Sequence, residues 1–215
     1  MPDVPDAAGS TRGNRLAAAA LLVWAVAVVA AFGMLGRYKA TAATQVPDGP
    51  PLVWPEESAL PRTPGRPTLV VFVHPHCGCT QATVTELGRL LGRVRGPLDA
   101  RVAVVRPEGV PDGWDETALV GRAESIPGVA VFRDAGGAEA ARFAGSASGF
   151  TVVYGADGRR LFAGGLTSAR GHEGESFGGR RIVSLLETGV ADRGDAPTFG
   201  CALASTAAAR EEGTE

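Results

Sequence analysis

The spacing of apolar and polar residues along the chain predicts where its helices and strands lie. Residues 68–73 form an unbroken apolar run, which is typical of a buried strand. Over residues 80–94 the apolar side chains recur every three or four positions, which predicts a helix. Apolar runs at 101–105 and 129–132 predict two further strands, with a short helix over 115–124 between them. This alternation indicates an α/β domain.

The next part of the chain predicts a hairpin and a closing helix. After one or two helical turns over 137–143, the apolar segments 150–154 and 159–163 flank a four-residue turn with two glycines. Two such segments around a glycine-containing turn are a hairpin signal. Residues 176–188 have helical periodicity, and Gly189 follows at the position where a left-handed residue often ends a helix.

An apolar segment near the N-terminus predicts a membrane anchor. Residues 16–36 contain no charged side chain, and at about 1.5 Å per residue they span roughly 30 Å, the thickness of the bilayer core. We expect a single-pass anchor in the lipid bilayer of the cytoplasmic membrane, with residues 1–15 as a cytoplasmic tail. A cleaved signal peptide is the alternative, because residues 40–42 are small. However, Arg37 and Lys39 lie between the long apolar run and that site.

Charge does not decide on which side of the membrane the domain lies, because basic residues flank the apolar run on both sides. Closely spaced cysteines are typical of an oxidising compartment, and a short N-terminal tail normally stays in the cytoplasm. We therefore expect the domain on the periplasmic or extracellular side. The net charge of −2 and the lack of a basic cluster argue against a nucleic acid partner.

The remaining segments complete the predicted domain organisation. Residues 37–67 contain seven prolines and no hydrophobic periodicity, which predicts a semi-rigid spacer. The α/β domain is expected over residues 68–190. Residues 191–215 have no periodicity and are expected to form a C-terminal tail that carries Cys201.

The candidate chemistry lies where the first strand meets the helix. His74, His76, Cys77 and Cys79 are four of the chain's six cysteines and histidines, and they fall within six positions. A thiol at a helix N-terminus faces free N–H groups and the positive end of the helix dipole, which favour the thiolate. Cys77 is therefore a candidate nucleophile, and a protonated His76 beside it would lower its pKa. A pair of thiols that only pack is the alternative.

The same segment resembles a known family. The sequence Phe-Val-His-Pro-His-Cys-Gly at 72–78 resembles the Phe-x-x-Pro-x-Cys-Gly signature that precedes the active helix of thioredoxin-like proteins. Residues 138–165 resemble the later half of membrane-tethered, TlpA-type proteins. The whole layout, with Gly-His-Glu-Gly at 171–174 and Phe-Gly-Cys at 199–201, resembles the bacterial RedB group. The resemblance implies a thioredoxin-like fold, a central mixed sheet flanked by helices, over about residues 66–190 after an N-terminal transmembrane helix.

Two features depart from the thioredoxin pattern. Only Gly78 separates Cys77 from Cys79, and side chains two apart on a helix project about 200° apart. A disulfide between them would need a turn and would be strained, and strained disulfides are readily reduced. Ser148 and Gly149 stand where thioredoxins have a cis-proline. Glycine tolerates unusual backbone dihedrals and is expected to keep that backbone shape.

The residues and the resemblance lead to two functional hypotheses. In the first, Cys77 attacks a disulfide of a partner protein, and Cys79 or Cys201 resolves the mixed disulfide without a cofactor. In the second, the protein is a Sco-like copper-binding or copper-delivery module. Cys77 and Cys79 with His172 or His76 would then hold Cu(I) for a metal-receiving partner.

Both hypotheses require distant segments to meet at the cysteines. We expect the hairpin to return the loop with His172 to the cysteine edge of the sheet, facing Cys77 across a shallow groove. Ser148 and Gly149 would form the floor of this groove. The tail is long enough to bring Cys201 over the same edge. Alternatively, His172 is an exposed loop residue, and Cys201 stays free or pairs between molecules.

Overall fold

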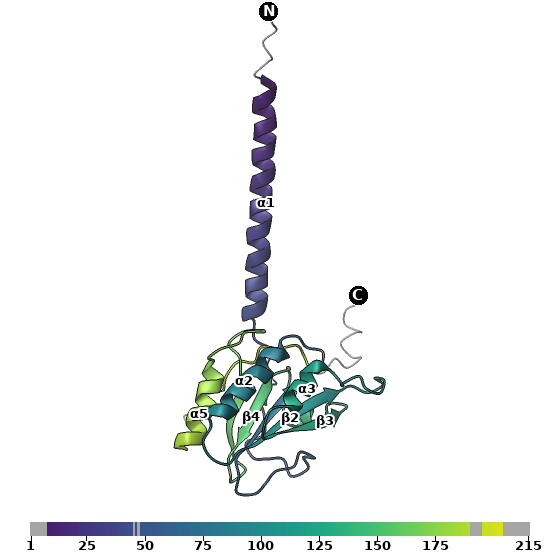
Figure 1. The fold of residues 1–215 in the computed structure, drawn as a ribbon, viewed down its shortest axis with the longest axis vertical. Helices are drawn as coiled ribbons and strands as arrows, with labels where there is room; N and C mark the ends of the chain where they lie inside the picture. Colours follow the sequence, from purple (N-terminus) through teal and green to yellow (C-terminus); the bar gives the residue numbers. More distant parts are fainter. Residues whose placement is uncertain (1–7, 45, 47, 190–194, 204–215) are drawn as a thin grey trace, which may run out of the picture. The chain divides into compact units, whose positions relative to one another are not determined.

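The structure is a computed structural model that describes residues 8–44, 46, 48–189 and 195–203. The chain divides into two compact units, residues 1–40 and 41–215, which are described separately. In the first unit, helix α1 (Ala8–Ala40) is the purple helix of Figure 1. Its segment Gly13–Ala40 is long and apolar enough to cross a membrane, and none of that span is buried. A helix of this kind is consistent with a signal anchor or with a signal sequence.

The second unit is built on a five-stranded mixed sheet (Figure 1). Its strands are β1 (Thr68–Val73), β2 (Asp99–Arg106), β3 (Val129–Ala135), β4 (Phe150–Tyr154) and β5 (Arg160–Gly165). They lie in the order β3-β2-β1-β4-β5, in which β1, β2 and β3 are parallel and β4 and β5 are antiparallel to their neighbours. The central strand is β1, and all six of its residues are buried.

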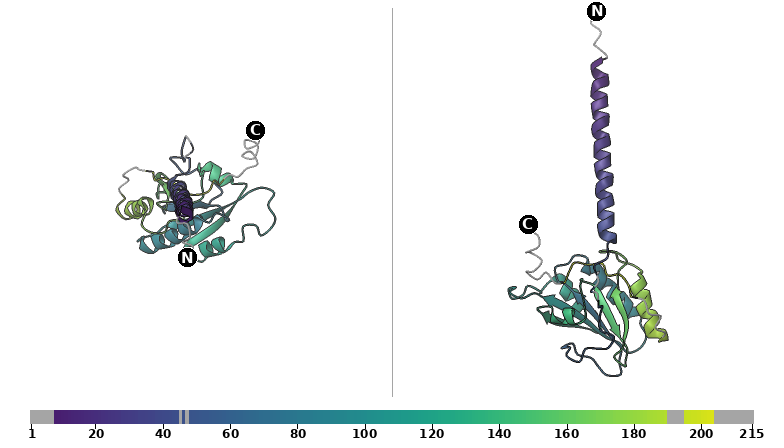
Figure 2. Two further views of the ribbon diagram at one scale, coloured as in Figure 1. Left: turned by 90° about the horizontal axis from the view of Figure 1, so that it is seen from above. Right: turned by 180° about the vertical axis from the view of Figure 1, so that it is seen from behind.

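Helices cover both faces of this sheet (Figures 1 and 2). They are α2 (Thr80–Arg93), α3 (Ala118–Glu124), α4 (Ala138–Arg142) and α5 (Phe177–Thr188). Because successive strand residues point to opposite faces, Leu69 and Val71 pack with α2, α3 and α5, whereas Val70 and Phe72 pack with α4. The predicted thioredoxin-like fold is confirmed.

Part of the predicted spacer packs on the domain instead of standing apart from it. The Trp54 ring makes edge-on contacts with Phe143 and Tyr154 at centroid distances of 5.1 and 5.2 Å, and Leu60 is buried in the same cluster. Val53 forms a β-bridge with Arg159. Residues 37–40, at the other end of the predicted spacer, belong to α1. Apolar side chains between the prolines therefore hold much of this segment on the α4 face of the sheet.

Part of the predicted tail is also docked. Residues 195–203, which we call the C-terminal segment, lie alongside β5 and then alongside the loop after α4. The Ala196 N–H donates to the Ala163 carbonyl at 3.0 Å, Ala202 forms an antiparallel bridge with Ala147, and Leu203 is 1% exposed. The rest of the predicted tail, 191–194 and 204–215, lies outside the described residues. This docking places Cys201 within the fold.

Candidate active site: a cluster of three thiols

The first two thiols of the site lie on the turn between β1 and α2. The Cys77 N–H donates to the His74 carbonyl at 3.1 Å, and the Thr80 N–H donates to the Cys77 carbonyl at 3.0 Å. Cys79 is the N-cap residue of α2. Cys77 therefore precedes the helix instead of lying on its surface. The turn lets Cys77 and Cys79 approach a common point, which two positions on a regular helix do not allow.

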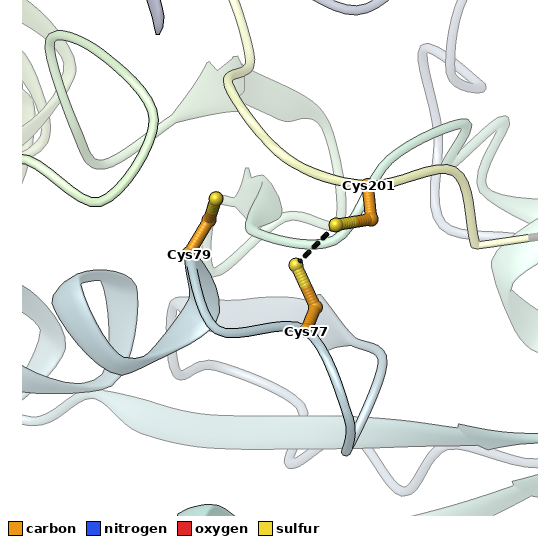
Figure 3. A group of neighbouring side chains, drawn as sticks. All are labelled: Cys77, Cys79 and Cys201. Carbon is orange, nitrogen blue, oxygen red and sulfur yellow. Dashed lines mark hydrogen bonds between the residues drawn. The ribbon is translucent and has the colours of Figure 1, made fainter.

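The third thiol comes from the C-terminal segment. The Ser148 N–H donates to the Cys201 carbonyl at 2.8 Å, and the Leu203 N–H donates to the Ser146 carbonyl at 3.1 Å. This strand-like pairing brings Cys201 opposite Cys77, and the two Sγ atoms are 2.8 Å apart (Figure 3). All three Sγ atoms of the cluster lie within 4.8 Å of one another.

The three thiols differ in their tendency to ionise. Cys77 is 4% exposed, and its burial opposes the thiolate. Hydrogen bonds from the Cys201 and Thr80 side chains outweigh this effect, so the pKa of Cys77 is lowered. Burial and then the hydrogen bond to Cys77 raise the pKa of Cys201. Burial and the negative charge of Cys77 raise the pKa of Cys79. Cys77 therefore ionises first, while Cys201 keeps its proton.

Ser148 connects the three segments that form the cluster. Its hydroxyl oxygen accepts a hydrogen bond from the His74 N–H at 2.8 Å and lies 2.6 Å from the Thr80 hydroxyl. Its backbone N–H donates to Cys201. One buried serine thus joins the end of β1, the start of α2 and the C-terminal segment.

Gly149 has a conformation that suits glycine. Its φ of 91° lies in the left-handed region, and a Cβ atom would lie 2.8 Å from the Thr83 hydroxyl oxygen. Its N–H donates to the Phe72 carbonyl at 2.8 Å, which joins this loop to β1. The described residues contain no cis peptide bond, so Ser148 and Gly149 form the loop with a trans bond.

The two histidines beside the cysteines make other contacts. His76 is exposed, and its Nε2 atom lies 2.8 Å from the Trp114 carbonyl oxygen. The His74 Nδ1 atom accepts a hydrogen bond from the His76 N–H at 3.2 Å. The hydrogen bonds that lower the Cys77 pKa come from Cys201, Thr80 and the Cys79 backbone. An effect of His76 on the Cys77 thiol stays a prediction.

The loop after β5 brings an arginine to the cluster, where the sequence predicted a histidine. The part of this loop around Gly174 is held against α2, because the Gly174 N–H donates to Glu86 Oε1 at 2.6 Å. His172 is exposed and does not belong to the thiol group found among the described residues. The Arg170 guanidinium instead donates to the Gly200 carbonyl, and its positive charge favours the thiolates of Cys79 and Cys201. Sequence reasoning missed Arg170 because its neighbours gave it no distinguishing signal.

Comparisons with known proteins agree with the fold. No family model matches the chain, and no match is found among curated proteins. Among solved structures, an uncharacterized conserved protein from Geobacillus kaustophilus is 17% identical, with 78% of this chain and 94% of that chain covered and a TM-score of 0.55.

Two further solved structures are similar to parts of this chain. A thioredoxin-like protein from Aeropyrum pernix is 15% identical, with 75% of this chain and 97% of that chain covered and a TM-score of 0.44. A secreted disulfide oxidoreductase from Mycobacterium tuberculosis is 16% identical, with 58% of this chain and 82% of that chain covered and a TM-score of 0.41. The likeness to the Geobacillus kaustophilus protein, at 17% identity and a TM-score of 0.55, shows a shared fold and no shared function. The narrower resemblance to TlpA-type and RedB proteins stays a prediction.

Proposed function

We propose that this chain is a membrane-anchored, extracytoplasmic thiol–disulfide exchange protein in which Cys77 is the nucleophile and Cys201 the resolving thiol. The observation that carries the proposal is the 2.8 Å separation of their Sγ atoms, which come from residues 124 positions apart. A disulfide has a sulfur–sulfur bond of about 2.05 Å, so a small rotation of the side chains brings the two atoms to bonding distance.

The reaction uses only thiols and a partner disulfide. The Cys77 thiolate attacks one sulfur of the partner disulfide, and the partner's other sulfur leaves as a thiolate. Cys201 then loses its proton and attacks the Cys77 sulfur, which forms the Cys77–Cys201 disulfide and releases the partner's second thiol. Two electrons pass to the partner. The same steps run in reverse when the partner's reduction potential is the lower one.

The order of ionisation supports this assignment of roles. The lowered Cys77 pKa provides a thiolate for attack on an outside disulfide. In the reverse direction, the same low pKa makes Cys77 a good leaving group from the mixed disulfide with the partner. Burial and the hydrogen bond to Cys77 raise the pKa of Cys201, and a mixed disulfide at Cys77 removes the thiolate that accepts this hydrogen bond.

The exposed apolar helix α1 supports the anchored location. The resemblance to TlpA-type and RedB proteins points to the same arrangement on the outer side of the cytoplasmic membrane. The copper hypothesis with His172 as a ligand has less support, because His172 is exposed and lies outside the thiol group.

Trapping of the mixed disulfide tests the assignment. Reduced full-length protein in detergent micelles is treated with oxidised glutathione, and the products are mapped by mass spectrometry. We expect Cys77–Cys201 in the unaltered protein, a stable glutathione adduct on Cys77 in Cys201→Ser, and no rapid exchange in Cys77→Ser. Cys79→Ser is the matched control and should still form Cys77–Cys201. A Cys77–Cys79 disulfide formed at an unchanged rate in Cys201→Ser would show that Cys79 resolves.

A further inference from the structure

Thiol–disulfide exchange requires two of the three clustered thiols and gives Cys79 no role. We propose that the reduced cluster of Cys77, Cys79 and Cys201 is a three-sulfur binding site for Cu(I). The Sγ atoms of these residues form a group of candidate ligands within the described part of the chain, and they lie within 4.8 Å of one another. The inference does not depend on the proposed exchange reaction, because it concerns the reduced protein and needs no partner disulfide.

The spacing of the sulfurs suits a three-coordinate ion. With metal–sulfur bonds of about 2.3 Å, the sulfurs of a trigonal site are roughly 4 Å apart. The separations in the cluster range from 2.8 Å for Cys77 and Cys201 up to 4.8 Å. Figure 3 shows the three side chains converging from two sides, Cys77 and Cys79 from the turn before α2 and Cys201 from the facing segment. Small side-chain rotations would therefore form the site without moving the backbone.

The type of ligand selects the ion. Thiolate sulfur is a soft ligand that favours Cu(I), and this group of described residues contains no carboxylate, a ligand that hard cations prefer. Zinc normally takes four protein ligands in a structural site, whereas this group offers three.

The surroundings suit an anionic metal–thiolate centre. Three thiolates and one monovalent cation carry excess negative charge. Arg170, which donates to the Gly200 carbonyl beside Cys201, places a positive charge next to the cluster. The N-terminus of α2 adds the positive end of its dipole next to Cys79. The burial of Cys77 shields the centre from solvent.

Metal binding and disulfide formation exclude each other. A Cys77–Cys201 disulfide forms when a disulfide acceptor removes two electrons and both thiol protons are lost, which leaves only the Cys79 thiolate for a metal. Cu(I) is therefore bound only by the reduced protein, and it should slow the oxidation of Cys77 by a disulfide.

A competition titration tests the site. Reduced full-length protein in detergent micelles, kept free of oxygen, is titrated with Cu(I) in the presence of a coloured Cu(I) chelator. We expect one Cu(I) per chain, with X-ray absorption showing three sulfur neighbours. Cys79→Ser should bind Cu(I) at least about 100-fold more weakly, since loss of a direct ligand exceeds the 10–100-fold cost of losing an outer partner. It should still form the Cys77–Cys201 disulfide, which shows that the variant is folded.

His172→Ala is the matched control for the histidine-containing ligand set, and its Cu(I) affinity should equal that of the unaltered protein. The three-thiol site is overturned if Cys79→Ser binds Cu(I) as tightly as the unaltered protein, or if His172→Ala loses the ion. It is also overturned if equimolar Zn(II) displaces Cu(I) from the unaltered protein. Each of these results leaves the exchange reaction intact, whereas a failure of exchange alone leaves the metal site intact.

Discussion

At the scale of single residues, the chemistry of the site depends on which of the three thiols ionises. Burial raises the pKa of each thiol, because it removes water from the charged form. Only the Cys77 thiolate gains enough hydrogen bonds to reverse this effect, and the largest contribution comes from the Cys201 side chain. The reactivity of Cys77 is therefore a property of the pair and not of the turn alone.

The first prediction concerns the pH dependence of Cys77. In reduced, chelator-treated protein, the rate of Cys77 alkylation should rise with pH to a midpoint below the ordinary thiol pKa of 9.0. In Cys201→Ala the thiolate loses its main donor while the effect of burial remains, so the midpoint should move to higher pH. Iodoacetamide labelling followed by peptide mass analysis measures this rate. An unchanged midpoint in Cys201→Ala would mean that the contact between the two thiols does not set the Cys77 pKa.

The second prediction concerns Ser148. In Ser148→Ala, the His74 N–H and the Thr80 hydroxyl lose their partner, and an unsatisfied buried group costs about 1–3 kcal/mol of stability. We expect the free energy of unfolding in urea to fall by that amount. Ser184→Ala, at an exposed position on α5, is the control and should change it by less than about 0.5 kcal/mol. If the two substitutions lower the free energy of unfolding equally, Ser148 does not have the connecting role described above.

At the scale of elements, sequence patterns predicted the segments whose signals are local. The boundaries of β1 matched because its apolar run is continuous, and α5 begins after its Ser176 cap and ends at Gly189 with a left-handed φ of 66°. The segment around Trp54 was expected to be a spacer, and whether the segment around Cys201 meets the domain was left open, because prolines or missing periodicity hide their contacts. Their positions depend on tertiary pairing, which no local pattern records.

The difference between local signals and tertiary pairing also explains which parts of the candidate site could be predicted from the sequence. The placement of Cys77 ahead of a helix follows from the run of apolar residues before it and the helical periodicity after it. The meeting of Cys201 with Cys77 depends on backbone pairing with the loop at Ser148, and the sequence left open whether this meeting occurs. Arg170 and His172 are two positions apart in an irregular loop. Only the attachment of that loop to α2 determines which of them lies near the thiols.

The third prediction concerns the docking of the C-terminal segment. A Cβ atom on Gly200 would lie 1.8 Å from the Ser148 carbonyl oxygen, a backbone atom that has no room to move away. Gly200→Ala should therefore push Cys201 away from Cys77. Formation of the internal disulfide should slow about a hundredfold, the typical cost of misplacing a reacting group by roughly 1 Å. The rate is measured by mass spectrometry after oxidised glutathione is added.

Gly92→Ala serves as the control for this substitution. Gly92 lies on α2 with no atom within 4 Å of an added Cβ, and alanine favours a helix by about 1 kcal/mol over glycine. We expect this variant to form the disulfide at the normal rate and to be slightly more stable. If Gly200→Ala also forms the disulfide at the normal rate, the close packing of the segment does not position Cys201.

At the scale of the whole molecule, the apolar helix and the thiol domain impose different requirements on the cell. The helix Gly13–Ala40 is unburied, and its residues 16–36 carry no charged side chain, so the helix is stable in a lipid bilayer or is removed as a signal sequence. The proposed exchange reaction requires a compartment in which disulfides persist. The proposed arrangement, an uncleaved helix with the domain outside the cytoplasm, would meet both requirements.

The last prediction follows from this arrangement. The mature protein should keep its N-terminal residues, sediment with membranes and resist extraction by alkaline carbonate, because removal of an apolar helix of this length from lipid is unfavourable. Protease added to intact spheroplasts should then digest the domain and leave a membrane-protected fragment containing α1. A soluble product that begins just after residues 40–42 would identify a signal sequence. Digestion of the domain only after lysis would place the thiols in the cytoplasm, where a stable Cys77–Cys201 disulfide is not expected.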